Sequence, residues 1–278
     1  GVYQIIFLDK IPKSAAVNES VNLAKRYGHK SSSNFVNAIL RKVEKTDYKE
    51  LFNTDNDVER ISKTTSMPVW IIEELLKEKE IEEVQEICEA SNSRPNISIR
   101  VNNLKTTKEK LKEELKKNNI QVEDGILDDF LVIKKVKNIE NFDLFKKGFF
   151  TIEDEGAGLI PIVLAPKQNE VVLDACSAPG GKTTYIAELM NNKGKIEAWD
   201  IYEHRLKLVN QNAKRLGIDI INTSTKDATK YNEEYKDKFD KILLDVPCLG
   251  IGVLKRKPDI KWKRKKEDIE EIKKIRSI

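Results

Sequence analysis

The clearest pattern in the chain is a short apolar run followed by a turn and an amphipathic segment. Residues 171–173 are aliphatic and mostly β-branched, which predicts a buried strand, and Pro179 with Gly180 and Gly181 ends it. Over residues 182–190 the apolar positions recur at helical spacing. The pattern predicts a strand, a glycine-rich turn whose backbone a ligand can approach closely, and a helix.

Three further strand-like runs follow, at residues 195–200, 220–225 and 241–245, and a helical pattern that Gly217 ends lies between the first two. This order of elements predicts an open, parallel α/β sheet. Ligands of such sheets bind outside the carboxyl ends of the strands. We therefore expect one crevice to collect the aspartates that end or follow the strands, Asp174, Asp200, Asp227 and Asp245.

Two classes of cofactor compete for the glycine-rich turn. Gly181-Lys182-Thr183 looks like the end of a phosphate-binding P-loop, but that motif needs a glycine five residues before Gly181, where Cys176 stands. Pro179 also removes a backbone donor that a phosphate cradle uses. The other class places an acidic residue at the end of the second strand for a ribose hydroxyl pair, and Asp200 supplies it. The sequence therefore favours a cofactor that is held by its ribose over a P-loop nucleotide.

Ahead of the sheet the pattern changes twice. Apolar residues at helical spacing, among them Val17 and Ile39, predict a fragment of a helical bundle. Further on, a strand, a helix with a capping box at Thr106 and Glu109, and two more strands predict a small β-α-β-β module. We expect four parts: a helical domain at 1–57, a helical connector at 58–93, the module at 94–150 and the sheet domain at 151–278.

Composition and charge add a candidate partner. The chain of 278 residues is 39% hydrophobic and has no apolar run of bilayer length, so cores can form and a membrane span is not expected. The net charge is only +4, yet residues 255–278 hold eleven Lys or Arg against five Asp or Glu. Basic side chains around Trp262 are typical of an RNA-tracking surface with a stacking ring, although a solvated helix is the alternative. The candidate RNA contacts are Lys255, Arg256, Lys257, Lys261, Lys263 and Arg264.

Cysteine and histidine usage limits the other chemistries. The three cysteines, Cys88, Cys176 and Cys248, lack the spacing of a disulfide framework or a metal site. We therefore expect reduced thiols, a cytoplasmic protein and no metal. Neither of the two histidines has a partner at a telling spacing. General-base duty would then fall on a carboxylate, for which Asp245 is the candidate.

Several motifs stand in a fixed order along the second half of the chain: D-A-C-S-A-P-G-G-K-T at 174–183, D-V-P-C at 245–248, and G-x-G-V-x-x-x-x-P-D-I-K-W at 250–262. Together they resemble the RNA cytosine-C5 methyltransferases, and within these the bacterial 16S rRNA methyltransferase B family, also called Sun or Fmu. Segments 11–19 and 33–41 are similar to the NusB-like domain of this family. The β-α-β-β module resembles its RNA-recognition-like module, so the resemblance covers essentially the whole chain.

The resemblance implies S-adenosylmethionine as cofactor and a cytidine of small-subunit rRNA as substrate. In this chemistry a cysteine thiolate adds to C6 of the cytosine, C5 then takes the methyl group, and loss of the C5 proton expels the thiolate. The implied cofactor contacts are Cys176, Ser177, Ala178, Pro179, Gly180, Gly181, Lys182, Asp200, Asp227 and Asp245.

The resemblance also implies roles that this chain fulfils only in part. Cys248 is implied to assist product release, because the family's nucleophile belongs to a later Thr-Cys motif that is not in this sequence. We therefore expect a fragment that lacks part of both ends of its domain set, and leave its own activity open. Glu153 stands where the family has Gln, with an exposed acidic turn as the alternative. The rival function is a non-catalytic RNA-binding or assembly protein with a relic cofactor fold.

Overall fold

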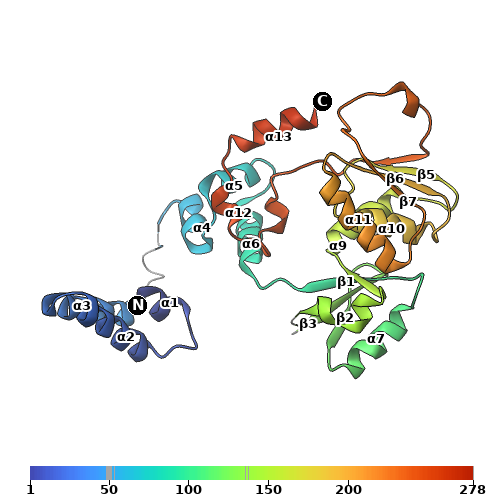
Figure 1. Ribbon diagram of the computed structural model, residues 1–278. Helices are drawn as coiled ribbons and strands as arrows, with labels where there is room; N and C mark the ends of the chain where they lie inside the picture. The colour runs from blue at the N-terminus through green and yellow to red at the C-terminus, as the bar shows by residue number, and fades with distance from the viewer. Residues whose placement is uncertain (48–51, 53, 135, 137, 278) are drawn as a thin grey trace. The chain divides into compact units, whose positions relative to one another are not determined.

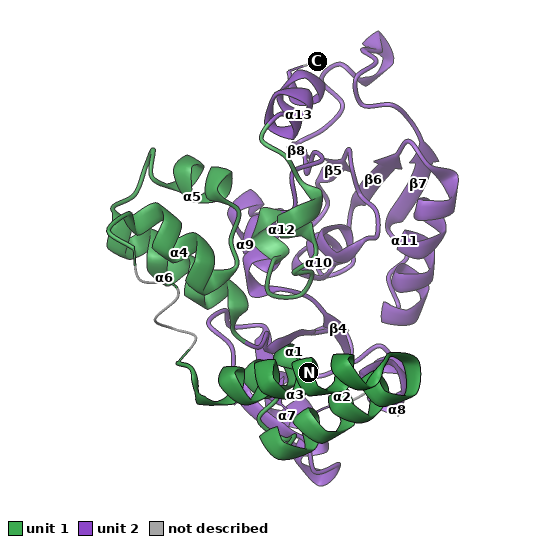
Figure 2. Cartoon of the chain, turned by 90° about the vertical axis from the view of Figure 1, so that its left-hand side faces the viewer, with its two compact units in different colours: residues 1–93, 251–266 green, residues 94–250, 267–278 purple. Residues whose placement is uncertain are grey.

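The computed structural model describes residues 1–47, 52, 54–134, 136 and 138–277. These residues form two compact units (Figure 2). Unit 1 contains residues 1–93 and 251–266, and unit 2 contains residues 94–250 and 267–278. The expected α/β fold class is confirmed, with a helical start, an antiparallel α+β module and a partial parallel sheet. The four finer boundaries expected from the sequence stay a prediction.

Unit 1 begins with three helices, α1 (Val2–Phe7), α2 (Lys13–Tyr27) and α3 (Lys30–Lys45) (Figure 1). Their apolar faces meet in one buried cluster that includes Ile5, Val17 and Leu40. The predicted apolar face is therefore buried only in part: Val17 packs in this core, whereas Ile39 of α3 is 42% exposed. Burying such a face is what stabilises short helices.

Three further helices of unit 1 share a second core, α4 (Asp57–Thr65), α5 (Val69–Leu75) and α6 (Ile81–Asn92). The side chain of Asn56 caps α4 by accepting a hydrogen bond from the Glu59 N–H at 3.0 Å. The later segment 251–266, with η4 (Ile251–Val253) and α12 (Ile260–Lys263), belongs to this unit as well. Its Leu254 is buried among Ile61, Ile72 and Cys88.

The first part of unit 2 is an antiparallel module of four strands and one main helix. Its elements are β1 (Ile97–Val101), α7 (Lys108–Lys117), β2 (Gln121–Asp124), β3 (Phe130–Lys134) and β4 (Phe150–Ile152). The strand order is β2-β3-β1-β4, so β4 adds a strand that the sequence pattern did not predict. The capping prediction was one residue early, because Thr107 is the N-cap of α7 and accepts from the Lys110 N–H at 3.4 Å.

A second, parallel sheet follows in the order β7-β6-β5-β8. Its strands are β5 (Val171–Asp174), β6 (Lys195–Asp200), β7 (Ile221–Thr225) and β8 (Lys241–Leu243). The predicted fourth strand is shorter than expected. Asp174 pairs with Leu243 as the last register position, because the partner strand β5 turns away after Asp174, and Asp245 therefore lies in the following loop.

Helices cover this parallel sheet, namely α9 (Glu155–Leu164), α10 (Gly181–Leu189) and α11 (Glu203–Leu216) (Figure 1). Val172 and Ile196 of the sheet, Ile186 of α10 and Leu216 of α11 share one core. Gly217 ends α11 with a φ of +76°, a left-handed conformation that costs glycine little. A last helix of unit 2, α13, spans Asp268–Arg276.

None of the helices in the described parts of the chain is both long and apolar enough to span a membrane.

Candidate cofactor and active site

The turn between β5 and α10 is shaped by its glycines and by hydrogen bonds to neighbouring elements. Gly180 has a φ of +102°, and a Cβ placed on it would lie 3.1 Å from the Val209 Cα, so only glycine fits without strain. The Ser177 N–H donates to the Trp199 carbonyl at 2.8 Å, and the Ala178-Pro179 peptide bond is cis. The turn thus leads directly into the amino-terminal end of α10.

Asp174, the last residue of β5, is buried beneath this turn with 1% of its surface exposed. Its Oδ2 accepts a hydrogen bond from Thr183 Oγ1 at 2.7 Å. Its Oδ1 is enclosed and has no hydrogen-bond partner among the described residues. Burial raises the pKa of this carboxyl to about 6. An enclosed acceptor without a donor is a feature that a bound ligand can satisfy.

A cavity of about 210 Å³ opens beside the turn and contains most of the predicted cofactor contacts. Lys182 of α10 donates from Nζ to Asp245 Oδ2 at 2.6 Å, which joins the helix to the loop after β8. The residues that line the cavity are Ile152, Glu153, Ala157, Asp174, Cys176, Ser177, Ala178, Pro179, Gly181, Lys182 and Asp245.

Asp200 lies at the end of β6, as predicted, and its carboxylate is buried. It accepts from the Tyr202 N–H at 3.0 Å and pairs with Arg205 at 3.0 Å. The same Arg205 donates to the Ala178 carbonyl at 3.0 Å. Arg205, which the sequence pattern did not single out, therefore connects the predicted ribose-binding carboxylate to the glycine turn.

Asp227 and Cys248 are placed differently from the cavity residues. Both are exposed, and neither is among the residues that line the cavity. Asp227 accepts hydrogen bonds from the N–H and Oγ1 of Thr229 at 3.0 and 2.7 Å, and these lower the pKa of its carboxyl. Cys176 does line the cavity, where burial and the nearby carboxylates raise the pKa of its thiol. Cys176 is therefore a thiol in contact with the cavity, not an activated thiolate.

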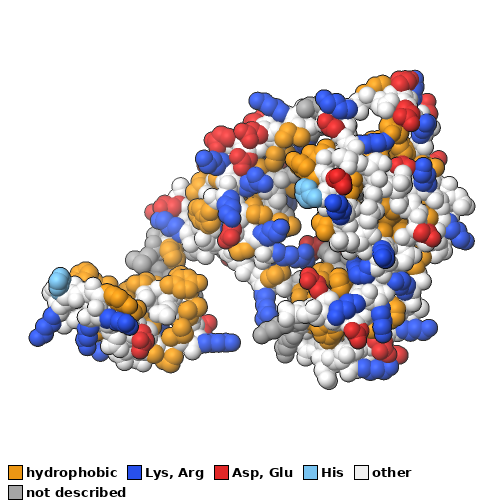
Figure 3. All heavy atoms as spheres, in the orientation of Figure 1, with side chains coloured by type: hydrophobic (Ala, Val, Ile, Leu, Met, Phe, Trp, Pro, Cys, Tyr) orange, Lys and Arg blue, Asp and Glu red, His pale blue; other side chains and the backbone are white. Residues whose placement is uncertain are grey.

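The predicted RNA contacts follow the loop after β8. Lys255, Arg256, Lys257 and Lys263 are exposed, and Arg264 is partly buried. Trp262 is 65% exposed, as a residue that offers a stacking surface must be. Figure 3 shows Lys and Arg side chains at many separate places on the visible face, with Asp and Glu among them.

Lys261 was wrongly predicted as an RNA contact, because it is only 3% exposed. Its Nζ donates to Asn92 Oδ1 at 2.5 Å and to the Thr65 carbonyl at 3.5 Å. Burial lowers the pKa of this ammonium group. The helical pattern of a short basic run does not reveal that one of its lysines faces the α4–α6 core of unit 1.

A buried charge network that the sequence did not reveal lies behind the cavity. Arg100 of β1 is fully buried and donates to Glu153, to both carboxylate oxygens of Glu188, and to the Gly181 carbonyl at 3.0 Å. Burial opposes the charge of Arg100, but the two carboxylates outweigh it and raise the pKa of the guanidinium. An exposed acidic turn at Glu153 is excluded, since Glu153 is 8% exposed. No local signal marks Glu188, because Thr184 and Tyr185 stand one turn before it on the same face of α10.

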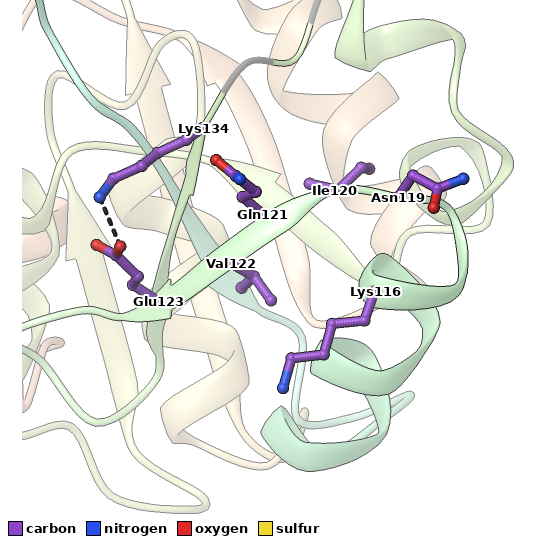
Figure 4. Close-up of a pocket in the computed structure, with 7 residues that line it drawn as sticks. All are labelled: Lys116, Asn119, Ile120, Gln121, Val122, Glu123 and Lys134. Atoms are coloured by element: carbon purple, nitrogen blue, oxygen red, sulfur yellow. Dashed lines mark hydrogen bonds and ion pairs between the residues drawn. The ribbon is translucent and has the colours of Figure 1, made fainter.

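A second hollow, of about 560 Å³, lies beside β2 and the end of α7 (Figure 4). Lys116 of α7, Gln121 and Glu123 of β2 and Lys134 of β3 border it, and Lys134 pairs with Glu123 at 2.5 Å. It contains none of the predicted site residues. Within the described part of the chain, no group of His, Cys, Asp and Glu is placed to hold a metal ion.

The parallel sheet, its glycine turn and the strand-end carboxylates define the class of protein: a methyltransferase-type α/β fold, present here in part. Family models agree, matching residues 161–277 with "16S rRNA methyltransferase RsmB/F", residues 1–45 with the NusB family, and residues 67–140 with the ferredoxin-like domain of RsmF/B-like methyltransferases. Three segments of the chain therefore match domains of the RsmB family of 16S rRNA methyltransferases: a NusB amino-terminal domain, a ferredoxin-like domain and the methyltransferase domain.

Individual relatives show the same likeness. The chain is 38% identical over 96% of its length to the probable ribosomal RNA small subunit methyltransferase B of Bacillus subtilis, and 34% identical over 98% to that of Shewanella oneidensis. It spans only 60% and 61% of those two proteins. A solved methyltransferase homologue from Pyrococcus horikoshii matches 78% of this chain and 68% of its own, with a TM-score of 0.67 and 28% identity.

Proposed function

We propose that this chain binds S-adenosylmethionine and contributes to methylation of C5 of a cytidine in 16S rRNA, as part of a longer protein. The observation that carries the proposal is the cavity at the glycine turn, which collects Asp174, Lys182 and Asp245 from three separate elements. The names of the relatives support rRNA as the substrate.

The residues at the cavity fit this cofactor. Asp174 Oδ1 is an enclosed acceptor for which the described residues offer no donor, and the glycine turn leaves its backbone open to close approach. Asp200, held by Arg205, is not among the residues that line the cavity, but it ends β6, the position at which an acidic residue binds a ribose hydroxyl pair in such folds. When bound, the cofactor supplies an electrophilic methyl group.

The catalytic roles that residues of this chain can supply belong to the loop after β8. Lys182 holds Asp245 at the mouth of the cavity, where its carboxylate can orient a base and accept or deliver a proton. Cys248, three residues further on, is accessible and suits product release. Asp227 stays a proposed cofactor contact, and Lys255, Arg256, Lys257, Lys263 and Arg264 stay proposed RNA contacts. A cytoplasmic location fits a ribosomal RNA substrate.

Isothermal titration of the chain with S-adenosylhomocysteine, with ATP as the control ligand, tests the proposal. Asp200→Ala should weaken S-adenosylhomocysteine binding about 10- to 100-fold, because it removes charge-assisted hydrogen bonds of roughly 1.5–3 kcal/mol. The exposed Asp219→Ala is the matched control and should bind like the wild type.

The possible results separate the competing functions. Unchanged affinity in Asp200→Ala would contradict its ribose role. Binding of ATP instead of S-adenosylhomocysteine would restore the P-loop interpretation. A folded chain that binds neither ligand would favour the non-catalytic RNA-binding protein.

A further inference from the structure

Glu153 is part of the cavity wall although its side chain is almost entirely buried. It follows β4 and is held by Arg100, whose Nη1 donates to Glu153 Oε2. The same guanidinium donates to Glu188 from Nε at 3.1 Å and from Nη2 at 3.0 Å, one bond to each carboxylate oxygen. Glu188 therefore uses both oxygens on Arg100, whereas Glu153 uses one.

The other oxygen of Glu153, Oε1, has no hydrogen-bond partner among the residues that the structure describes. Oε1 is not fully enclosed either. Among the described residues, the enclosed side-chain atoms without a hydrogen-bond partner are Asp174 Oδ1 and Trp199 Nε1. Oε1 lies next to the glycine turn, since a Cβ placed on Gly181 would be 2.9 Å from it. A largely buried carboxylate thus keeps one accessible acceptor at the cavity.

The charges around this acceptor favour a cationic donor. Arg100 carries one positive charge against the two carboxylates that it holds. In the cavity itself Glu153, Asp174 and Asp245 face a single cation, Lys182, whose ammonium group is already paired with Asp245 at 2.6 Å. A charged donor that enters the cavity gains a charge-assisted hydrogen bond at Oε1.

We propose that Glu153 Oε1 accepts a hydrogen bond from the ammonium group of the cofactor's amino-acid part. This inference rests on the proposed function and assigns one more contact within the same site. Of the two cationic centres of S-adenosylmethionine, the sulfonium and the ammonium group, only the ammonium group carries N–H donors, so an acceptor that favours a charged donor selects that end. Arg100 acts as a positioning residue, because it fixes the Glu153 carboxylate and binds the Gly181 carbonyl of the turn.

The test compares two ligands that differ in the amino-acid part: S-adenosylhomocysteine, which has it, and 5′-methylthioadenosine, which lacks it. Titration calorimetry measures both with wild type, Glu153→Gln and Glu153→Leu. Glu153→Leu should weaken S-adenosylhomocysteine about 10-fold or more and leave 5′-methylthioadenosine within about 2-fold. Glu153→Gln, which keeps an acceptor without the charge, should fall between wild type and Glu153→Leu.

Glu188→Gln is the matched control, because Glu188 is bound by the same guanidinium but is not among the residues that line the cavity. It should bind both ligands within about 3-fold of wild type, since the amide oxygen of Gln still accepts one of the two hydrogen bonds that Arg100 donates to Glu188. Equal losses for both ligands in the Glu153 variants would overturn the inference and leave a structural role through Arg100. A selective loss in Asp174→Asn alone would overturn it in favour of Asp174 as the acceptor. Wild type that binds neither ligand would overturn the proposed function together with this inference.

Discussion

At the scale of single residues, the site depends on carboxylates whose burial costs free energy when they are ionised. Asp174 accepts a hydrogen bond from the Thr183 hydroxyl, but burial outweighs this and raises its pKa from 3.8 to about 6. The folded state therefore binds the proton of Asp174 more tightly than the unfolded chain does. Its contribution to stability is complete below about pH 3.8 and is lost as the pH rises through about 6.

The raised pKa of Asp174 therefore predicts a measurable pH dependence of the unfolding free energy. A shift of about two pKa units corresponds to about 3 kcal/mol of unfolding free energy lost between pH 4 and pH 7. Asp174→Asn should remove that loss, because the amide still accepts from Thr183 but does not ionise. Urea unfolding of both proteins across this pH range measures the difference. Parallel curves for the two proteins would show that Asp174 does not carry the buried charge.

At the scale of elements, the segment that follows the Pro-Cys motif is anchored by the helices of unit 1. Leu254 is buried in their core, and Lys261 of α12 donates to Asn92 of α6 and to the carbonyl of Thr65 in α4. Cys88 is fully buried in the same core. The helical connector therefore fixes the chain that leaves the proposed active-site loop.

Lys261→Met should loosen this anchor, since it keeps the length of the side chain but leaves Asn92 Oδ1 without its donor. We expect unit 1 to lose about 1–3 kcal/mol of stability. Alkylation of Cys88 by iodoacetamide, followed by peptide mass spectrometry, should become faster. The exposed Lys263→Met serves as the control and should leave the rate unchanged. Equal protection of Cys88 in both variants would contradict the anchoring role.

At the scale of the whole molecule, net charge says little about RNA binding, because the total of +4 hides a local surplus. The basic segment 255–266 supplies exposed lysines next to an exposed tryptophan ring. Phosphate contacts release counterions, so their number is read from the salt dependence of binding.

Replacing Lys255, Lys257 and Lys263 with alanine should weaken binding of a 16S rRNA fragment and reduce the slope of log K against log salt by at most about 2–3. Filter binding at several salt concentrations measures the slope. Alanine at Lys110, Lys214 and Lys238, which are exposed in unit 2, removes the same charge elsewhere. Equal slopes in the two triple variants would show that the basic segment does not contact the RNA and is a solvated helix.

The strand, glycine turn and helix around Gly180, the three later strands and the end of α11 at Gly217 could all be predicted from the sequence. These features depend on local preferences: apolar runs, positions that need glycine, and helical spacing. The same local logic placed Asp174 and Asp200 at strand ends. It failed at the end of β8, whose length is decided by its partner strand.

Only the tertiary structure decided which charged side chains are buried. Arg100 belongs to β1, in which apolar and polar residues alternate, yet it is fully buried against Glu153 and Glu188, the latter 88 residues away. Lys261 belongs to a basic run, yet it is buried against α4 and α6 of the same unit. In both cases the sequence determined the element and its polar face. What that face meets depends on distant segments that pack on it, and a local pattern contains no information about them.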